Sequence, residues 1–129
     1  MRLNPECIRD LLLTVEDTTT ISNAMEYYID QDNLPRLANY SHEEILYHIR
    51  QCKMAELITN AHFYDNGDLV IIPDLSPKGH EFLENIRSDN MWNDTKAVAN
   101  KVGSYSLNSL TTIATAVLTQ VINKQLGIA

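Results

Sequence analysis

The sequence is poor in several kinds of residue, and each shortage excludes a class of protein. Its 129 residues include two cysteines, four glycines and one tryptophan. No segment offers about 20 mainly apolar residues, the length that a membrane-spanning helix needs, so no membrane association is expected. There is also no glycine-rich phosphate loop, no nucleophile elbow and no His-Glu-x-x-His motif. We therefore expect a protein that is not an enzyme and needs no cofactor.

Basic residues are also scarce. Lys and Arg total 10 against 17 Asp and Glu, which gives a formal charge of −7. Proteins that neutralise DNA phosphates normally present a basic surface, so the charge disfavours DNA as a partner. All the acids lie within residues 1–94, whereas residues 95–129 carry only lysines as charged residues. The sequence therefore predicts an acidic body followed by a mildly basic tail.

The cysteines and histidines do not form a recognisable metal motif. Cys7 and Cys52 occupy apolar helical positions, and residues 4–6 (Asn-Pro-Glu) interrupt any signal-like apolar run. A cytoplasmic protein with reduced thiols is therefore expected. His48 and Cys52 share a helix face, but zinc needs three or four ligands. We expect no metal site, with Cys52 in the core and His48 half-buried and bonded to backbone.

Two helices have clear start signals in the first half of the chain. Asn4 can cap a helix that carries Pro5 at its first position. The run Ser41-His42-Glu43-Glu44 is typical of a capping box, in which the serine bonds a helical amide and Glu44 reaches back. Apolar side chains at helical spacing predict the buried stripes of these helices. The residues are Ile8, Leu11, Leu12 and Val15 in the first and Ile45, Ile49 and Cys52 in the second.

A β-hairpin is predicted to follow the second helix. Residues 58–64 and 69–72 form the expected strands, and Asp65-Asn66-Gly67-Asp68 lies between them. Asn66-Gly67 is a strong hairpin signal, because a tight turn needs positive φ at both positions. Before the second helix the pattern is ambiguous, because residues 21–29 fit either a strand or a short helix. Residues 34–37 are expected to be extended, because Leu34 precedes a proline.

Three further helices are predicted, beginning near residues 76, 90 and 106. The last one has no charged residue between Val102 and Asn123, and its apolar stripe is broad. This stripe could pack on the body of the chain, bind a membrane surface or mediate self-association. We favour a homodimer, because an uncharged flank avoids like-charge repulsion across a two-fold axis. The candidate oligomerisation residues are Leu107, Leu110, Ala114, Val117, Leu118 and Val121.

The order of helix, extended segment, helix, hairpin and helix is that of a winged-helix domain. The sequence therefore predicts a mostly helical α+β fold, a winged helix whose wing is the hairpin. We assign residues 1–88 to this domain and residues 89–129 to a C-terminal helical extension that mediates oligomerisation.

The chain also resembles a known family, an uncharacterised bacterial and phage family called domain of unknown function 2513. The resemblance lies in residues 40–58 (YSHEEILYHIRQCKMAELI), 72–73 (IP) and 75–92 (LSPKGHEFLENIRSDNMW). It implies a winged-helix fold and a phage or prophage setting, and no established activity. Family members usually have a glycine where this chain has Glu56, so a different turn is expected after the second helix.

The candidate partner-binding surface combines the outward face of the second helix with the hairpin tip. Its residues are Glu43, Glu44, Tyr47, Arg50, Asp65 and Asp68. The helix face could simply be solvated, contact a protein or contact DNA. Two carboxylates at the N-terminal end of the helix would repel phosphates, since DNA contacts concentrate there. An acidic tip suits a basic protein surface better than a phosphate backbone.

These observations favour a protein that binds a host protein. It could inhibit a host nucleic-acid-handling or defence protein in the manner of a DNA mimic. The alternative is a dimeric DNA-binding regulator, which follows from the fold alone. That alternative requires a basic patch formed by Arg36, Arg50, Lys53 and Lys78.

Overall fold

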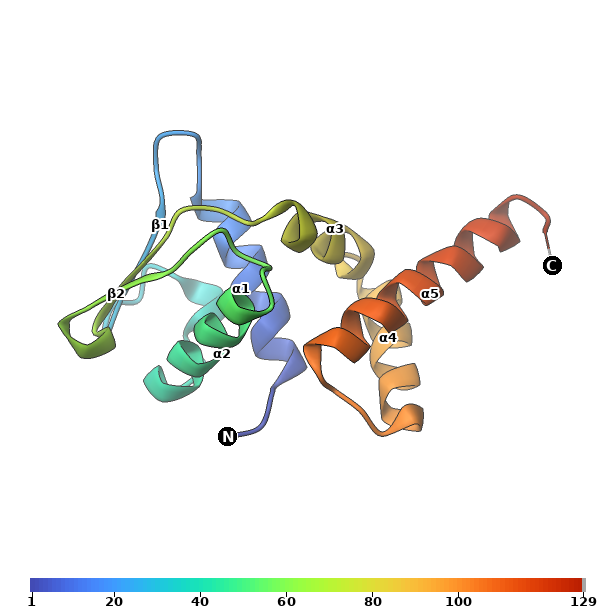
Figure 1. Ribbon diagram of the computed structural model, residues 1–129, viewed down its shortest axis with the longest axis horizontal. Coiled ribbons are helices and arrows are strands. Elements are labelled where there is room, and N and C mark those ends of the chain that lie inside the picture. The colour runs from blue at the N-terminus through green and yellow to red at the C-terminus, as the bar shows by residue number, and fades with distance from the viewer. Residues whose placement is uncertain (129) are drawn as a thin grey trace. The chain divides into compact units, whose positions relative to one another are not determined.

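The computed structural model describes residues 1–128 and shows an α+β chain in which helices predominate (Figure 1). The elements are α1 (Pro5–Thr18), β1 (Met25–Tyr28), the 3-10 helix η1 (Pro35–Leu37), α2 (His42–Met54), β2 (His62–Tyr64), the 3-10 turn η2 (Asp65–Gly67), β3 (Leu69–Ile72), α3 (Pro77–Ile86), α4 (Asp89–Val102) and α5 (Leu107–Gln125). The chain divides into two compact units, Met1–His80 and Glu81–Ala129.

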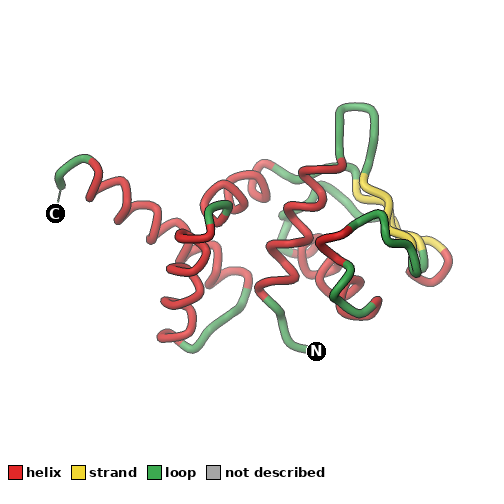
Figure 2. The backbone as a smooth tube through the Cα atoms, turned by 180° about the vertical axis from the view of Figure 1, so that it is seen from behind, coloured by secondary structure: helices red, strands yellow, loops and turns green. Residues whose placement is uncertain are grey.

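The three strands form one antiparallel sheet in the order β1-β3-β2 (Figure 2). β3 is therefore central, with Met25 of β1 and His62 of β2 paired to its C-terminal end. Val70 and Ile72 are fully buried on one face of β3, as the two-residue period of a strand requires. All three residues of β2 are exposed, so this edge strand offers its side chains to solvent.

The core of the first unit forms where α1 and α2 pack on each other. The predicted stripes are confirmed, because every one of their side chains is at most 4% exposed. Full burial of an aliphatic side chain of this size contributes roughly 1.5–3 kcal/mol. This packing fixes the opposite face of α2 toward solvent.

Side-chain caps begin both helices, with one difference from the prediction. Asn4 accepts a bond from the Glu6 amide at 3.1 Å, and Ser41 accepts one from the Glu44 amide at 3.1 Å. The carboxylate of Glu44 does not reach back to Ser41 as predicted. It accepts a bond from the Asn4 side-chain amide at 3.3 Å instead. The prediction was wrong because the α1 cap supplies a competing donor.

Two segments near the sheet differ from expectation. Residues 35–37 form a 3-10 helix, whereas an extended segment was predicted. A proline disfavours the helical backbone conformation at the residue before it, and Leu34 has φ −122° and ψ 80°. This restriction does not extend to Pro35, which starts the 3-10 helix. The β2–β3 connection is a four-residue loop, because Tyr64 pairs with Leu69. Asn66 and Gly67 have positive φ as predicted, but the first strand of the hairpin covers only His62–Tyr64 and not residues 58–64.

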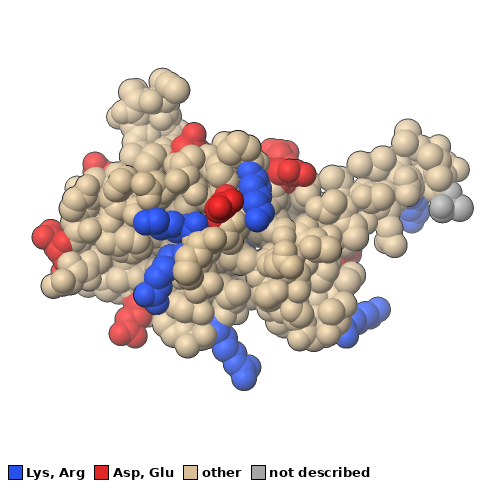
Figure 3. All heavy atoms as spheres, in the orientation of Figure 1, with Lys and Arg blue, Asp and Glu red and all other residues tan. Residues whose placement is uncertain are grey.

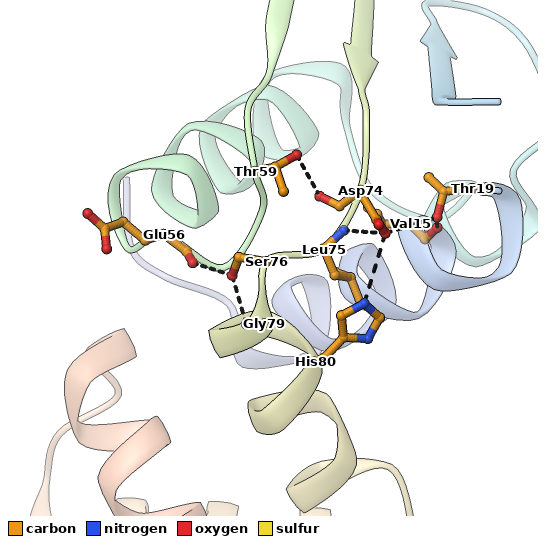
Figure 4. A network of polar contacts seen from close by, with 9 residues as sticks. All are labelled: Val15, Thr19, Glu56, Thr59, Asp74, Leu75, Ser76, Gly79 and His80. Carbon is orange, nitrogen blue, oxygen red and sulfur yellow. Dashed lines mark hydrogen bonds and ion pairs between the residues drawn. The ribbon is translucent and has the colours of Figure 1, made fainter. Parts of the chain in front are cut away.

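The corner between α2 and α3 is built from backbone groups (Figure 4). α2 ends with bonds from the Leu57 amide to the Cys52 carbonyl (2.9 Å) and from the Glu56 amide to the Lys53 carbonyl (3.1 Å). The Ser76 hydroxyl donates to the Glu56 carbonyl and accepts from the Gly79 amide. A Cβ on Gly79 would overlap the Leu57 carbonyl oxygen, so only glycine fits here.

In the second unit, α4 and α5 pack on each other. Serine side chains at residues 88 and 106 cap the two helices. The buried residues are Trp92, Thr95 and Ala99 on α4 and Leu107, Leu110, Ala114 and Val117 on α5. No described residue after Val117 is buried, and this half of α5 extends past α4 (Figures 1 and 2).

Candidate functional site

A groove of about 550 Å³ lies between α2 and the turn that joins β2 to β3. We call it the helix–turn groove; its lining residues are Met1, Glu43, Leu46, Tyr47, Arg50, Phe63, Asn66 and Gly67. Apolar and aromatic side chains contribute much of the lining. Glu43 and Arg50 stand seven residues apart on α2, roughly 10 Å along the helix axis. The groove therefore has an apolar wall, with a negative charge toward one end and a positive charge toward the other.

Tyr47 and Arg50 are held against the wall of the groove. The Tyr47 hydroxyl donates to the Met1 carbonyl oxygen at 3.3 Å. The Arg50 guanidinium carbon lies 6.0 Å from the centre of the Tyr47 ring, at the outer limit of a cation–π contact. Tyr47 is half-buried, whereas Arg50 is exposed. The aromatic face is thus fixed by its neighbours, and the cation remains accessible to a ligand.

Gly67 brings the β2–β3 turn close to α2. A Cβ at this position would lie 2.7 Å from Leu46 Cδ1, and the residue has φ +92°. Both the close approach and the left-handed backbone favour glycine. The Asn-Gly pair in the sequence therefore serves the contact between turn and helix as well as the chain reversal.

His42 connects the first turn of α2 with β1 and with the β2–β3 turn. Its Nδ1 lies 2.7 Å from the Tyr27 hydroxyl, and its Nε2 lies 3.5 Å from Asp68 Oδ1. The Tyr27 and His42 rings stack with centroids 5.7 Å apart. Burial, followed by the charges of Asp30 and Asp68, raises the pKa of Tyr27, so its hydroxyl keeps its proton. The Tyr27–His42–Asp68 cluster thus holds the turn against α2, which the sequence analysis did not anticipate.

The six predicted partner-binding residues do not all lie in one place. Glu43, Tyr47 and Arg50 line the helix–turn groove. Glu44 is half-buried and bonded to Asn4, so it belongs to the junction of α1 and α2. Asp65 is exposed at the turn and Asp68 faces His42, and neither lines the groove.

The structure also adds groove residues that the sequence analysis missed. One of them is Phe63, which is 42% exposed and stands next to Tyr64 at 48%. Their positions alternate along β2, so only Phe63 lines the groove. The sequence signal for Phe63 is the pair of large aromatic residues directly before the Asn-Gly turn. Such residues on an exposed strand indicate a face that no other element covers.

The candidate oligomerisation residues are divided by burial. Leu107, Leu110, Ala114 and Val117 are buried within the chain, so they are core residues of the second unit before any second copy binds. Leu118 is half-buried and Val121 is 37% exposed. The large exposed apolar side chains of α5 therefore lie after Val117. Most of the predicted oligomerisation residues lie before that point.

The buried histidine and thiols have structural environments. His48 is fully buried and not half-buried as predicted. Its burial is tolerated because both ring nitrogens bond backbone groups: Nδ1 donates to the Glu44 carbonyl at 2.7 Å and Nε2 accepts from the Asn4 amide at 2.8 Å. Burial, with smaller effects from Glu44 and Asp10, raises the pKa of Cys7 to about 12, and burial also raises that of Cys52. Neither thiol is therefore primed as a nucleophile.

Residues 1–128 contain no group of three His, Cys, Asp or Glu side chains placed to hold a metal ion. No described helix is both long and apolar enough to cross a membrane.

The basic residues that DNA binding would require are dispersed or engaged. Arg36 forms an ion pair with Asp17 at 3.2 Å, and Lys53 donates to the Ala61 carbonyl at 3.2 Å. In the face shown in Figure 3, the Lys and Arg side chains form separate groups, with acidic side chains among and around them. This face therefore carries no continuous basic surface.

The fold and the groove define a small α+β protein, and no solved structure matches the chain. The chain belongs to the family described as hypothetical protein DUF2513, which matches residues 2–106. It is also similar to an uncharacterised protein of Haemophilus influenzae strain Rd. The two are 26% identical over 125 residues, which cover 95% of this chain and 99% of that protein.

Proposed function

We propose that this chain is a winged-helix protein that acts by binding a protein partner in the helix–turn groove, and not by catalysis. The order α1, β1, α2, β2, β3 supports the winged-helix assignment, with η1 in the place of a longer helix. In this assignment α2 is the helix that would read DNA, and the β2–β3 hairpin is the wing. The groove lies between these two elements.

The composition of the groove carries the proposal. Tyr47 and Arg50 belong to the residue types that dominate the binding energy of protein interfaces. Phe63 adds an exposed aromatic side chain, and Glu43 adds an accessible carboxylate. A matching partner segment presents an apolar side chain to the aromatic wall and a basic group to Glu43.

A phosphate backbone fits this surface poorly. Glu43 stands in the first turn of α2, Arg36 is paired with Asp17, and the Lys53 ammonium group is held at the Ala61 carbonyl. Neutralising several phosphates requires several free cations along one path. A dimeric DNA-binding regulator is therefore an outcome for the test below and not the favoured function.

The family resemblance implies a phage or prophage setting, and this directs the proposal to a bacterial host protein. Proteins that handle nucleic acid carry basic surfaces, which an acidic helix end can occupy. We therefore propose inhibition of a host nucleic-acid-handling or defence protein, in the manner of a DNA mimic.

Charge reversal tests the proposal. The tagged chain is incubated with host lysate, with and without nuclease treatment, and the bound proteins are quantified by mass spectrometry. Glu43→Lys should abolish capture of a stoichiometric partner. Glu26→Lys makes the same change of charge at an exposed position of β1 and should retain capture. Circular dichroism verifies that both variants are folded. Equal capture by both variants contradicts the groove assignment, and partners that disappear with nuclease support the DNA alternative.

A further inference from the structure

The α4–α5 hairpin leaves many large apolar side chains exposed. They are Val98, Val102, Tyr105, Val121, Ile122, Leu126 and Ile128, with exposed fractions between 37% and 68%. Of these side chains, Val98 and Val121 line a common groove. Large exposed apolar patches usually mark contact sites. The residues come from the second unit alone, so they are independent of the helix–turn groove.

A groove of about 340 Å³ runs between the two helices of this unit. α4 supplies Asp94, Ala97 and Val98, and α5 supplies Val117, Gln120, Val121 and Lys124. The groove is therefore apolar along its middle, with a carboxylate on one helix and an ammonium group on the other.

The two charged side chains of this groove have no partner among the described residues. Among residues 1–128, the structure shows no hydrogen bond or ion pair for the side chain of Asp94 or of Lys124. Both residues are exposed. Lys124 is also the one charged residue of α5. Opposite charges that share an apolar groove without pairing are suited to partners outside the chain.

We propose that this groove binds the same groove of a second copy about a two-fold axis. Such an interface must be self-complementary, so that residue i meets residue j and j meets i. Asp94 of each copy then faces Lys124 of the other, and the valines at 98 and 121 form the apolar centre. Because α5 carries no charged residue before Lys124, it brings no like charges together at the two-fold axis.

Reversing the charges at residues 94 and 124 tests the proposal. Sedimentation equilibrium measures the molar mass of the full chain over a range of concentrations. Wild type should form a dimer. Asp94→Lys and Lys124→Asp should each weaken dimerisation by about tenfold or more, because each creates two like-charge contacts. An equimolar mixture of the two variants should recover the dimer, because each of the two contacts in the mixed dimer then joins one lysine to one aspartate.

Two controls make the result specific. Lys101→Asp changes the net charge as much as Lys124→Asp but lies outside the groove, so its dimer should persist. Val121→Asn, at a side chain already 37% exposed, should weaken the dimer without altering the charge. The proposal is overturned if wild type is monomeric at every concentration. It is equally overturned if the mixture stays monomeric, or if Lys101→Asp dissociates the dimer as well.

Discussion

Glu56 occupies the left-handed position that ends α2, with φ 61°. The two bonds that close the helix form the pattern in which this position is usually glycine. Glu56 therefore bears a backbone cost that its side chain does not offset, since its carboxylate has no partner among the described residues.

Replacing Glu56 should stabilise the chain. Glu56→Gly removes a left-handed cost of about 1–2 kcal/mol but adds freedom to the unfolded chain, so we expect a net gain of about 0.5–1 kcal/mol. Urea unfolding measures the change. Glu56→Ala retains the left-handed cost and should give little or no gain. A glycine variant less stable than wild type would refute this account of the turn.

Gly79 is expected to be intolerant of even a methyl group. Gly79→Ala forces α3 away from the Leu57 carbonyl and should cost about 3 kcal/mol, at the upper end of overpacking penalties. The neighbouring Lys78→Ala, at an exposed position of the same turn, should change stability by no more than about 0.5 kcal/mol. Thermal unfolding of the two variants compares them, and similar midpoints would contradict the close contact.

The buried thiols should make the chain sensitive to alkali. The pKa of Cys7 rises from 9.0 unfolded to about 12 folded, and that of Cys52 is also raised. The stability is therefore fully present below pH 9 and falls as the pH approaches 12, by about 1.4 kcal/mol per pH unit for each thiol. Urea unfolding at pH 8 and pH 10 under reducing conditions should show this loss. A Cys7→Ala, Cys52→Ala variant should lose less, and an unchanged slope in it would contradict the assignment to the thiols.

At the scale of elements, α2 and the β2–β3 turn are joined by side chains from three parts of the chain. Tyr27 of β1, His42 of α2 and Asp68 after the turn meet in one cluster, and the Ile29 amide donates to the Asp68 carbonyl at 2.9 Å. These contacts fix the width of the helix–turn groove. His42 therefore positions the site without lining it.

Removing His42 should loosen the turn while leaving the sheet intact. His42→Ala deletes contacts worth about 1 kcal/mol, so amide exchange at Ile29 and Asp68 should accelerate about fivefold. Exchange at Val70 in the central strand should stay near the wild-type rate. His62→Ala, on the exposed strand, is the matched control and should affect neither amide. Hydrogen exchange followed by NMR distinguishes this result from a uniform acceleration, which would mean that His42 supports the whole unit.

The elements that the sequence predicted correctly depend on local signals. The caps at Asn4 and Ser41 and the apolar stripes of α1 and α2 follow from spacing alone, and they were confirmed. The Tyr27–His42–Asp68 cluster could not be predicted, because it joins separate segments of the chain only once the sheet has formed. For the same reason Phe63 was missed in the groove, while Tyr47 and Arg50 were identified from the face of one helix.

At the scale of the whole molecule, the two units carry two different surfaces. The first unit has the helix–turn groove with its aromatic wall and opposed charges. The second unit has an apolar groove with an unpaired acid and an unpaired base. If the second groove forms a two-fold dimer, each particle presents two copies of the first. Binding two sites on a partner assembly would then gain avidity without further contacts.

The most direct test of partner binding compares Phe63→Ser with Tyr64→Ser in affinity capture from nuclease-treated lysate. The two residues are neighbours on β2 and similarly exposed, but only Phe63 lines the helix–turn groove. The account predicts that Phe63→Ser loses the stoichiometric protein partner and that Tyr64→Ser keeps it. Retention of the partner by Phe63→Ser, or its loss from both variants alike, would contradict the account.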